Sequence, residues 1–441
     1  MTARDESRLL QADPTKEFFV FMLTRDIDLD DAVTDLIDNS VDGARRLRAG
    51  GHFNGLTVAV TAQQDMFRIA DNCGGIEVDI ARNYAFRFGR ASGTPTTAHS
   101  IGQFGVGMKR GLFKIGRNFR IESTSERSRF TVGVNVEEWQ THDRWAFLID
   151  DLEEPDSPFP PERRGTIIEV TNLREDAASQ FGLENFQSRL AREIEAKHRR
   201  SMLKGLTISL NGVQLKPHND TILNSDQIQP AYDQGELTYP GPEPVRFEIL
   251  AGIGTSKPTE AGWNVYCNDR LVLGRDRTEV TGWGDGVPRY HNQFAEFRGY
   301  AYLDCDNASL LPWNTTKSGL DTDSGVYRAV RQKMVELMRP VIDFLNELDG
   351  ETTSAETDKP LTEAVNSTEE VEVSAARKAS TFVRPTLRTV RATPPRVRRI
   401  AYDKPNEQVE QVQRSLGVDS LRRVGEETFD YYYNLECRDD A

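Results

Sequence analysis

Apolar residues recur at helical spacing early in the chain, at Val33, Leu36, Ile37 and Val41, and the pair Gly50-Gly51 follows them. A spacing of three and four residues predicts a helix over 28–50 that buries one face. Runs of alternating or mostly apolar residues then predict strands. These runs are LTVAVTA, MFRIADN, FRIESTS, FTVGVNV and TIIEVTNL. The pattern predicts a mixed helix-and-sheet domain over residues 1–180.

A second body is predicted over residues 181–349. The helical stretch NFQSRLAREIEAKHRRSML opens it, and VYRAVRQKMVELMRPVIDFLNEL closes it as a second helix. Strand signals lie between them, in LTISLNG, VRFEILAGIG, GWNVYCNDRLVL and RGYAYLDC. The order of elements indicates an α+β chain with two successive α/β bodies.

The stretch 350–400 is low in apolar residues, acidic first and basic afterwards, and it is predicted to be a disordered linker. Residues 377–399 carry eight Arg or Lys residues and no acid. Residues 401–441 are predicted to form a C-terminal helical hairpin. A hairpin of this size cannot bury a core of its own, so it must dock on the body or on a protein partner.

The composition argues against a membrane-spanning protein, a disulfide-rich protein and a general nucleic-acid binder. The chain is 37% hydrophobic and 28% charged, with a net charge of −14, which opposes general affinity for nucleic acid. No apolar run is long enough to span a membrane. Four scattered cysteines show neither metal spacing nor a disulfide framework, so a cytoplasmic location is expected.

Candidate chemistry begins on the first predicted helix, in DLIDNSVDGA. Asp35, Asn39 and Asp42 are spaced by four and three residues and therefore share one helix face. An amide oxygen one turn from a carboxylate can hold Mg²⁺ while the carboxylate orients a water. The alternative is an ordinary solvated polar face.

Two later segments supply glycine turns. IADNCGGI places Asp71 at a strand end, where it could accept a hydrogen bond from an adenine amino group, although such a turn is often only a turn. SIGQFGVGMKRG precedes a predicted helix, and its free N–H groups and lysine suit phosphates. Thr166 begins a strand from which its hydroxyl could reinforce Asp71.

Together and in this order, these segments resemble the GHKL ATPases, the superfamily of gyrase B, the heat-shock chaperone, histidine kinases and MutL. The segment FGVGMKRG is similar to the corresponding segment of the MORC-like branch. The resemblance implies a Bergerat-type ATP-binding α/β sandwich that uses ATP and Mg²⁺, followed by a transducer-like α/β domain. It makes Asn39 the metal ligand and residues 84–104 a lid. The implied nucleotide contacts are Asn39, Asp42, Asp71, Gly75, Gly102, Gly105, Val106, Gly107, Met108, Lys109 and Thr166.

Two positions depart from the family pattern, and one distant residue fits it. Asp35 stands where the family has its catalytic glutamate, and a displacement of about 1 Å can cost on the order of 100-fold in rate, so slow hydrolysis is expected. Cys73 replaces the first glycine of the adenine motif. Lys317, in LPWNTTKSGLD, resembles the transducer lysine that reaches the γ-phosphate; the alternative is a surface lysine in a polar turn.

The leading functional hypothesis is an ATPase that acts as a nucleotide-gated clamp and forms a homodimer when ATP is bound. The alternatives are a nucleotide-binding interaction module with negligible turnover and a histidine-kinase-like phosphotransferase. The histidine-kinase-like phosphotransferase is disfavoured because no histidine precedes Asn39. The basic stretch Arg377–Arg399 could contact DNA phosphates, or it could be a solvated linker or a partner-binding segment.

Overall fold

The protein is described from a computed structural model. The chain divides into two compact units, Met1–Thr386 and Leu387–Ala441. The structure describes residues 13–89, 97–102, 105–238, 243–353, 358–385 and 400–437.

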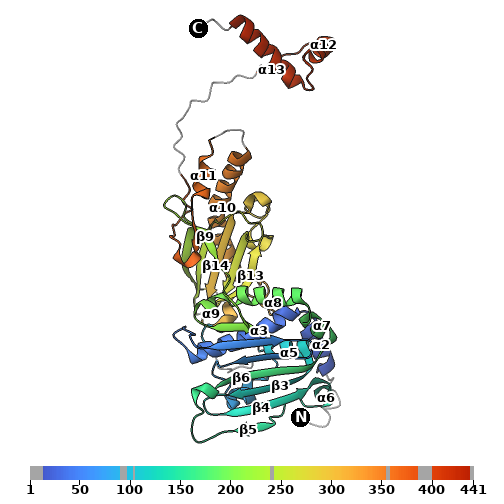
Figure 1. The fold of residues 1–441 in the computed structure, drawn as a ribbon, viewed down its shortest axis with the longest axis vertical. Helices are drawn as coiled ribbons and strands as arrows, with labels where there is room; N and C mark the ends of the chain where they lie inside the picture. The colour runs from blue at the N-terminus through green and yellow to red at the C-terminus, as the bar shows by residue number, and fades with distance from the viewer. Residues whose placement is uncertain are drawn as a thin grey trace, which may run out of the picture. The chain divides into compact units, whose positions relative to one another are not determined.

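The first part of the larger unit is built on an eight-stranded sheet (Figure 1). Its strand order is β5-β4-β3-β6-β2-β1-β7-β8, and all neighbours are antiparallel except β1 and β7. The strands are β1 (Thr57–Ala62), β2 (Phe67–Asp71), β3 (Gly116–Thr124), β4 (Arg129–Asn135), β5 (Asp151–Glu153), β6 (Gly165–Leu173), β7 (Thr207–Leu210) and β8 (Val213–Gln214).

Helices α3 (Leu29–Leu47) and α5 (Gly107–Ile115) pack on each other and against this sheet (Figure 1). The apolar stripe that predicted α3 is buried, with Val33, Leu36, Ile37 and Val41 at most 1% exposed. The remaining helices of this region are α2 (Lys16–Arg25), α4 (Val78–Ile80), the π-helical turn Ala81–Ala85, α6 (Val136–Thr141), α7 (Glu175–Phe181), α8 (Glu184–Lys197) and α9 (Arg199–Leu203).

The second part is a five-stranded sheet in the order β10-β11-β14-β12-β13, against which the long helix α10 packs. A small two-stranded sheet joins β9 to β15. The elements are β9 (Thr221–Leu223), β10 (Ala231–Leu237), β11 (Val245–Ile253), β12 (Gly262–Cys267), β13 (Arg270–Asp276), β14 (Phe297–Asp304), α10 (Gly325–Thr353), α11 (Pro360–Asn366) and β15 (Glu370–Glu372).

The sequence boundaries and the structure differ in two places. The eight-stranded sheet continues beyond residue 180, because β7 pairs in parallel with β1 after the helices α7 to α9. The range 350–400, predicted to be a disordered linker, contains α11 and β15, and β15 pairs with β9. Both differences arise from pairing between distant segments, which local composition does not reveal.

The C-terminal unit contains α12 (Asn406–Leu416) and α13 (Leu421–Tyr432). Gly417 ends α12 in the left-handed conformation (φ 67°), as a helix-terminating glycine does. The predicted α+β class, with an α/β sandwich first and helices at the C-terminal end, is confirmed. In the described part of the chain, each helix is too short or too polar to cross a membrane.

Candidate functional site

A cavity of about 330 Å³ opens between α3, the ends of β2 and β6, the turn before α5, and the turn that carries Lys317. Most of the predicted site residues line it, although they come from five separate segments. They are Asp35, Asn39, Asp42, Asp71, Gly75, Gly102, Gly105, Gly107, Met108, Lys109, Thr166 and Lys317. Val106 is not among the lining residues; it is the N-cap of α5.

One end of the cavity is organised around Asp71, the last residue of β2. Its Oδ2 accepts a hydrogen bond from Ser40 Oγ at 2.7 Å. Its Oδ1 accepts from the backbone N–H groups of Cys73 at 2.8 Å and Thr166 at 3.3 Å. Burial raises the pKa of Asp71, while these three donors oppose the rise. The carboxylate is thus fixed in orientation by neutral donors.

Thr166 supports this end differently from the prediction. Asp71 and Thr166 are register partners in the β2–β6 pair, so the backbone N–H of Thr166 reaches the carboxylate. The Thr166 hydroxyl instead contacts Ser123 Oγ at 3.0 Å, and Ser123 Oγ accepts from Ile76 N–H at 2.8 Å. Strand pairing therefore supplies a second layer of hydroxyls behind Asp71.

The turn after β2 requires glycine. Gly75 has φ +71°, and a Cβ there would lie 2.1 Å from the carbonyl oxygen of Thr124. Cys73, the departure from the family pattern, is 2% exposed, and its carbonyl oxygen lies 2.8 Å from where a Cβ on Gly43 would stand. Gly43 on the facing helix therefore allows the backbone of residue 73 to approach α3 closely.

Asp42 organises the segment before α5. Its two carboxylate oxygens accept hydrogen bonds from the backbone N–H groups of Ile101 at 2.8 Å and Gly102 at 2.7 Å. Asp42 also forms an ion pair with Arg45 at 3.5 Å. It is 6% exposed, which excludes a solvated helix face at this position. Residues 90–96 and 103–104 of the predicted lid lie outside the described residues.

Lys109, the predicted phosphate contact, is tied to backbone carbonyls. Its Nζ donates to Ala85 O at 2.9 Å and Gly105 O at 2.5 Å, and the side chain is 2% exposed. Burial lowers the pKa of Lys109 to about 7. Lys109 therefore links the turn before α5 to the π-helical turn, besides lining the cavity.

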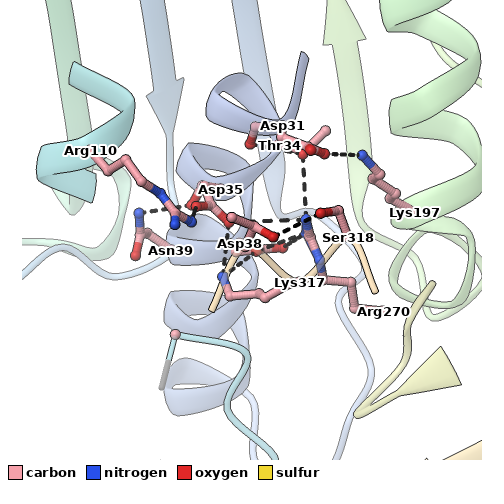
Figure 2. A network of polar contacts seen from close by, with 12 residues as sticks. Asp31, Thr34, Asp35, Asp38, Asn39, Arg110, Lys197, Arg270, Lys317 and Ser318 are labelled. Carbon is pink, nitrogen blue, oxygen red and sulfur yellow. Dashed lines mark hydrogen bonds and ion pairs between the residues drawn. The ribbon is translucent and has the colours of Figure 1, made fainter. Parts of the chain in front are cut away.

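The other end of the cavity is an ion network centred on Asp35 (Figure 2). Asp35 Oδ1 lies 3.0 Å from Lys317 Nζ, and Asp35 Oδ2 lies 2.5 Å from Arg110 Nη2. Lys317 is 4% exposed, which excludes a surface lysine, and its backbone has φ +54°. Both oxygens of the predicted general base are consequently held by cations from two distant segments.

Asp38 extends the network toward β13 (Figure 2). Arg270 Nη1 contacts its two oxygens at 2.7 and 2.8 Å, and Lys317 Nζ contacts Oδ2 at 2.7 Å. Burial would raise the pKa of Asp38, but Arg270 and Lys317 lower it to about 2. His198, fully buried 3.9 Å away, has its pKa lowered to about 3 by burial.

The metal prediction concerns the side-chain amide of Asn39. Asn39 Nδ2 donates to the backbone oxygen of Asp35 at 3.1 Å, which fixes the amide and leaves Oδ1 as a ligand atom. Among the described residues no cluster of three or more His, Cys, Asp or Glu could hold a metal on its own. Mg²⁺ commonly binds through one or two protein oxygens, water and substrate phosphates, so the Asn39 amide fits this role.

Sequence reasoning missed several residues of the site. Asp38 lies three residues after the predicted Asp35, so helical spacing could have placed both on one face of α3. Arg110 directly follows Lys109, and neighbouring residues of a helix do not share a face, so it gave no such signal. Ser40 is identified only by its contact to Asp71 at the end of β2. Arg270 gave no local signal, because strand β13 approaches α3 only through the fold. Ser123 likewise depends on the β3–β6 register.

Comparison with known proteins agrees with this geometry. A family model described as histidine kinase-, DNA gyrase B-, and HSP90-like ATPase matches residues 27–166, which include α3, Asp71, the turn before α5 and Thr166. No curated protein matches the chain. The match supports placing this segment of the chain in the GHKL ATPase superfamily, with ATP binding as its general property.

Proposed function

We propose that this chain is an Mg²⁺-dependent ATPase in which the nucleotide controls a dimerising clamp, with slow turnover. One observation carries the proposal: Lys317, from the turn that precedes α10, enters the cavity and contacts Asp35 on α3 at 3.0 Å. The groups that would bind the γ-phosphate thus belong to both parts of the larger unit. A ligand that contacts both can change how they are joined.

Asp35 is the proposed general base. It accepts a proton from water while the water oxygen bonds to the γ-phosphorus and the bond to the β–γ bridging oxygen breaks, giving ADP and phosphate. In this structure both Asp35 oxygens are engaged by cations. A carboxylate whose two oxygens both contact cations has no free oxygen to accept the proton, and its side chain is one methylene shorter than glutamate. Both features favour slow hydrolysis.

Asn39 is the proposed metal ligand, and Asp71 is the proposed adenine contact. Bound Mg²⁺ would neutralise charge on the phosphates. Asp71 Oδ1 and Oδ2 are already oriented by Ser40, Cys73 and Thr166. An oriented carboxylate can accept from the adenine amino group without first being ordered, which keeps the entropic cost of binding low.

The proposed control by nucleotide follows from competition between the γ-phosphate and two carboxylates for Lys317. In the structure, Lys317 Nζ is shared by Asp35 and Asp38 at 3.0 and 2.7 Å. A γ-phosphate offers a third anion, whereas ADP does not. The differential contact between these two states supplies the free energy for a change in shape and for pairing of two chains.

A second candidate is an interaction module with negligible turnover, which the double ion pair on Asp35 also favours. The C-terminal unit exposes apolar and aromatic side chains on α13 and after it, which suits a protein partner. They are Leu421, Phe429, Tyr431, Tyr432, Tyr433 and Leu435.

DNA contact through Arg377–Arg399 stays a proposal, since residues 386–399 lie outside the described ranges. Within the described part of this stretch, Arg384 pairs with Glu347 at 2.6 Å. A cytoplasmic location stays a proposal too.

Calorimetry tests the binding function. The wild-type chain is expected to bind ATP more tightly with Mg²⁺ than without it, and Asn39→Ala should abolish this dependence while circular dichroism stays unchanged. A folded Asn39→Ala protein with unaltered Mg²⁺-dependent affinity would refute the metal assignment. Release of phosphate by the wild type separates the ATPase from the module without turnover.

A further inference from the structure

We propose that Arg110 is a γ-phosphate-sensing residue that holds Asp35 in the resting chain and moves to the terminal phosphate when ATP binds. The inference rests on the proposed ATPase function and deepens it. In this scheme Arg110 contacts the γ-phosphate of bound ATP, and its departure from Asp35 releases the carboxylate that takes the proton from water.

The geometry of Arg110 suits such an exchange. It lies in the first turn of α5, is 5% exposed and lines the cavity. Its Nη2 donates to Asp35 Oδ2 at 2.5 Å and to the backbone oxygen of Thr315 at 3.2 Å. Its buried Nε has no hydrogen-bond partner among the described residues. The guanidinium therefore joins three segments of the site and retains an unused donor.

The adjacent cation, Lys109, is less suited to sense the phosphate. Its ammonium donates to two backbone carbonyls of the turns that it connects, so leaving them would expose buried acceptors. Arg110 holds a carboxylate, and it can exchange one anion for another. Guanidinium stays charged at all working pH values and matches phosphate oxygens in fork geometry.

The exchange has a direct consequence for the base. In the structure, Arg110 and Lys317 each contact one oxygen of Asp35. When the γ-phosphate takes the guanidinium, Oδ2 becomes free to accept a proton from the attacking water. ADP lacks that phosphate, so it leaves the Arg110–Asp35 pair intact. Arg110 should therefore contribute to ATP affinity but not to ADP affinity.

The experiment compares Arg110→Gln with wild type by calorimetry, using a non-hydrolysable ATP analogue and ADP. Loss of a charged hydrogen bond to phosphate should weaken analogue binding by about tenfold, with ADP affinity within about twofold. The matched control is Lys114→Gln, one turn further along α5. Lys114 donates to Thr24 O at 3.0 Å and does not line the cavity, so neither affinity should change.

Failure of the inference and failure of the proposed function have separate signatures. An unchanged ratio of analogue to ADP affinity in Arg110→Gln overturns the role of Arg110, although wild type still binds and hydrolyses ATP. Absence of ATP binding by wild type overturns the proposed function itself. If Arg110→Gln does not fold, Arg110→Lys decides, because lysine cannot reproduce the fork: a threefold or larger loss of the ratio supports the inference, and a smaller loss overturns it.

Discussion

The two ends of the cavity are built on opposite principles. At the Asp71 end, a single carboxylate is held by neutral donors, namely Ser40 Oγ and the backbone N–H groups of Cys73 and Thr166. At the Asp35 end, two buried carboxylates meet three cations, Arg110, Arg270 and Lys317. The first end lies within one sheet and its covering helix. The second gathers groups that lie far apart in the chain.

This difference separates recognition from response. Neutral donors hold Asp71 in one orientation, which suits selective binding of a base. At the other end, Arg110 and Lys317 contact carboxylates, and a phosphate anion can compete with these carboxylates for the two cations. We infer that the Asp71 end decides what binds and that the Asp35 end reports which phosphates are present.

The largest effect is expected from Asp35→Asn. Removing a general base typically costs between 100-fold and 10,000-fold, so kcat should fall at least about 100-fold while ATP affinity is retained. The measurement is steady-state phosphate release. Asp31→Asn is the matched control, because Asp31 lies one turn earlier on α3 and pairs with Lys197 at 2.6 Å outside the cavity. Hydrolysis by Asp35→Asn at the wild-type rate would show that another group is the base.

The next largest effect is expected in the free energy of unfolding, which should fall more for a substitution at the Asp35 end than for one at the Asp71 end. Asp38→Asn removes the carboxylate that Arg270 and Lys317 both contact and leaves only Asp35 to balance them, and breaking such a buried network costs about 3–5 kcal/mol of unfolding free energy. Ser40→Ala removes one neutral hydrogen bond at the Asp71 end and should cost about 1 kcal/mol. Urea denaturation of both variants measures the contrast. Equal losses would contradict the distinction between the two ends.

A smaller effect is expected from acid. His198 faces Asp38, Arg270, Lys197 and Lys317, and its pKa is lowered from 6.5 to about 3. Since the folded value lies below the unfolded one, the unfolded chain binds the proton first. The contribution of neutral His198 to the free energy of unfolding is therefore fully present above pH 6.5, and it is lost as the pH drops toward 3.

His198→Gln removes this titration and should reduce the loss of unfolding free energy between pH 7.5 and 4.5 by roughly 2 kcal/mol. Asp38, with its pKa near 2, titrates below this window in the folded chain. Urea denaturation at the two pH values measures the difference. The same pH dependence in variant and wild type would mean that His198 does not carry the effect.

The sequence was informative where chemistry is local. Helix α3 and its face of Asp35, Asn39 and Asp42 follow from apolar spacing, and the glycine turn at Gly75 follows from composition. Arg270 could not be predicted, because it reaches Asp38 only when β13 packs near α3. The pairing of β7 with β1 was missed for the same reason, since parallel partners lie far apart in sequence.

We propose that the γ-phosphate, acting through Lys317, controls association of the chain. Light scattering at micromolar protein concentration tests it directly, with a non-hydrolysable ATP analogue, with ADP and without nucleotide. We predict a dimer with the analogue alone, and we predict that Lys317→Ala binds the analogue but does not dimerise. The same oligomeric state of the wild-type chain under all three conditions would contradict the clamp and favour the interaction module.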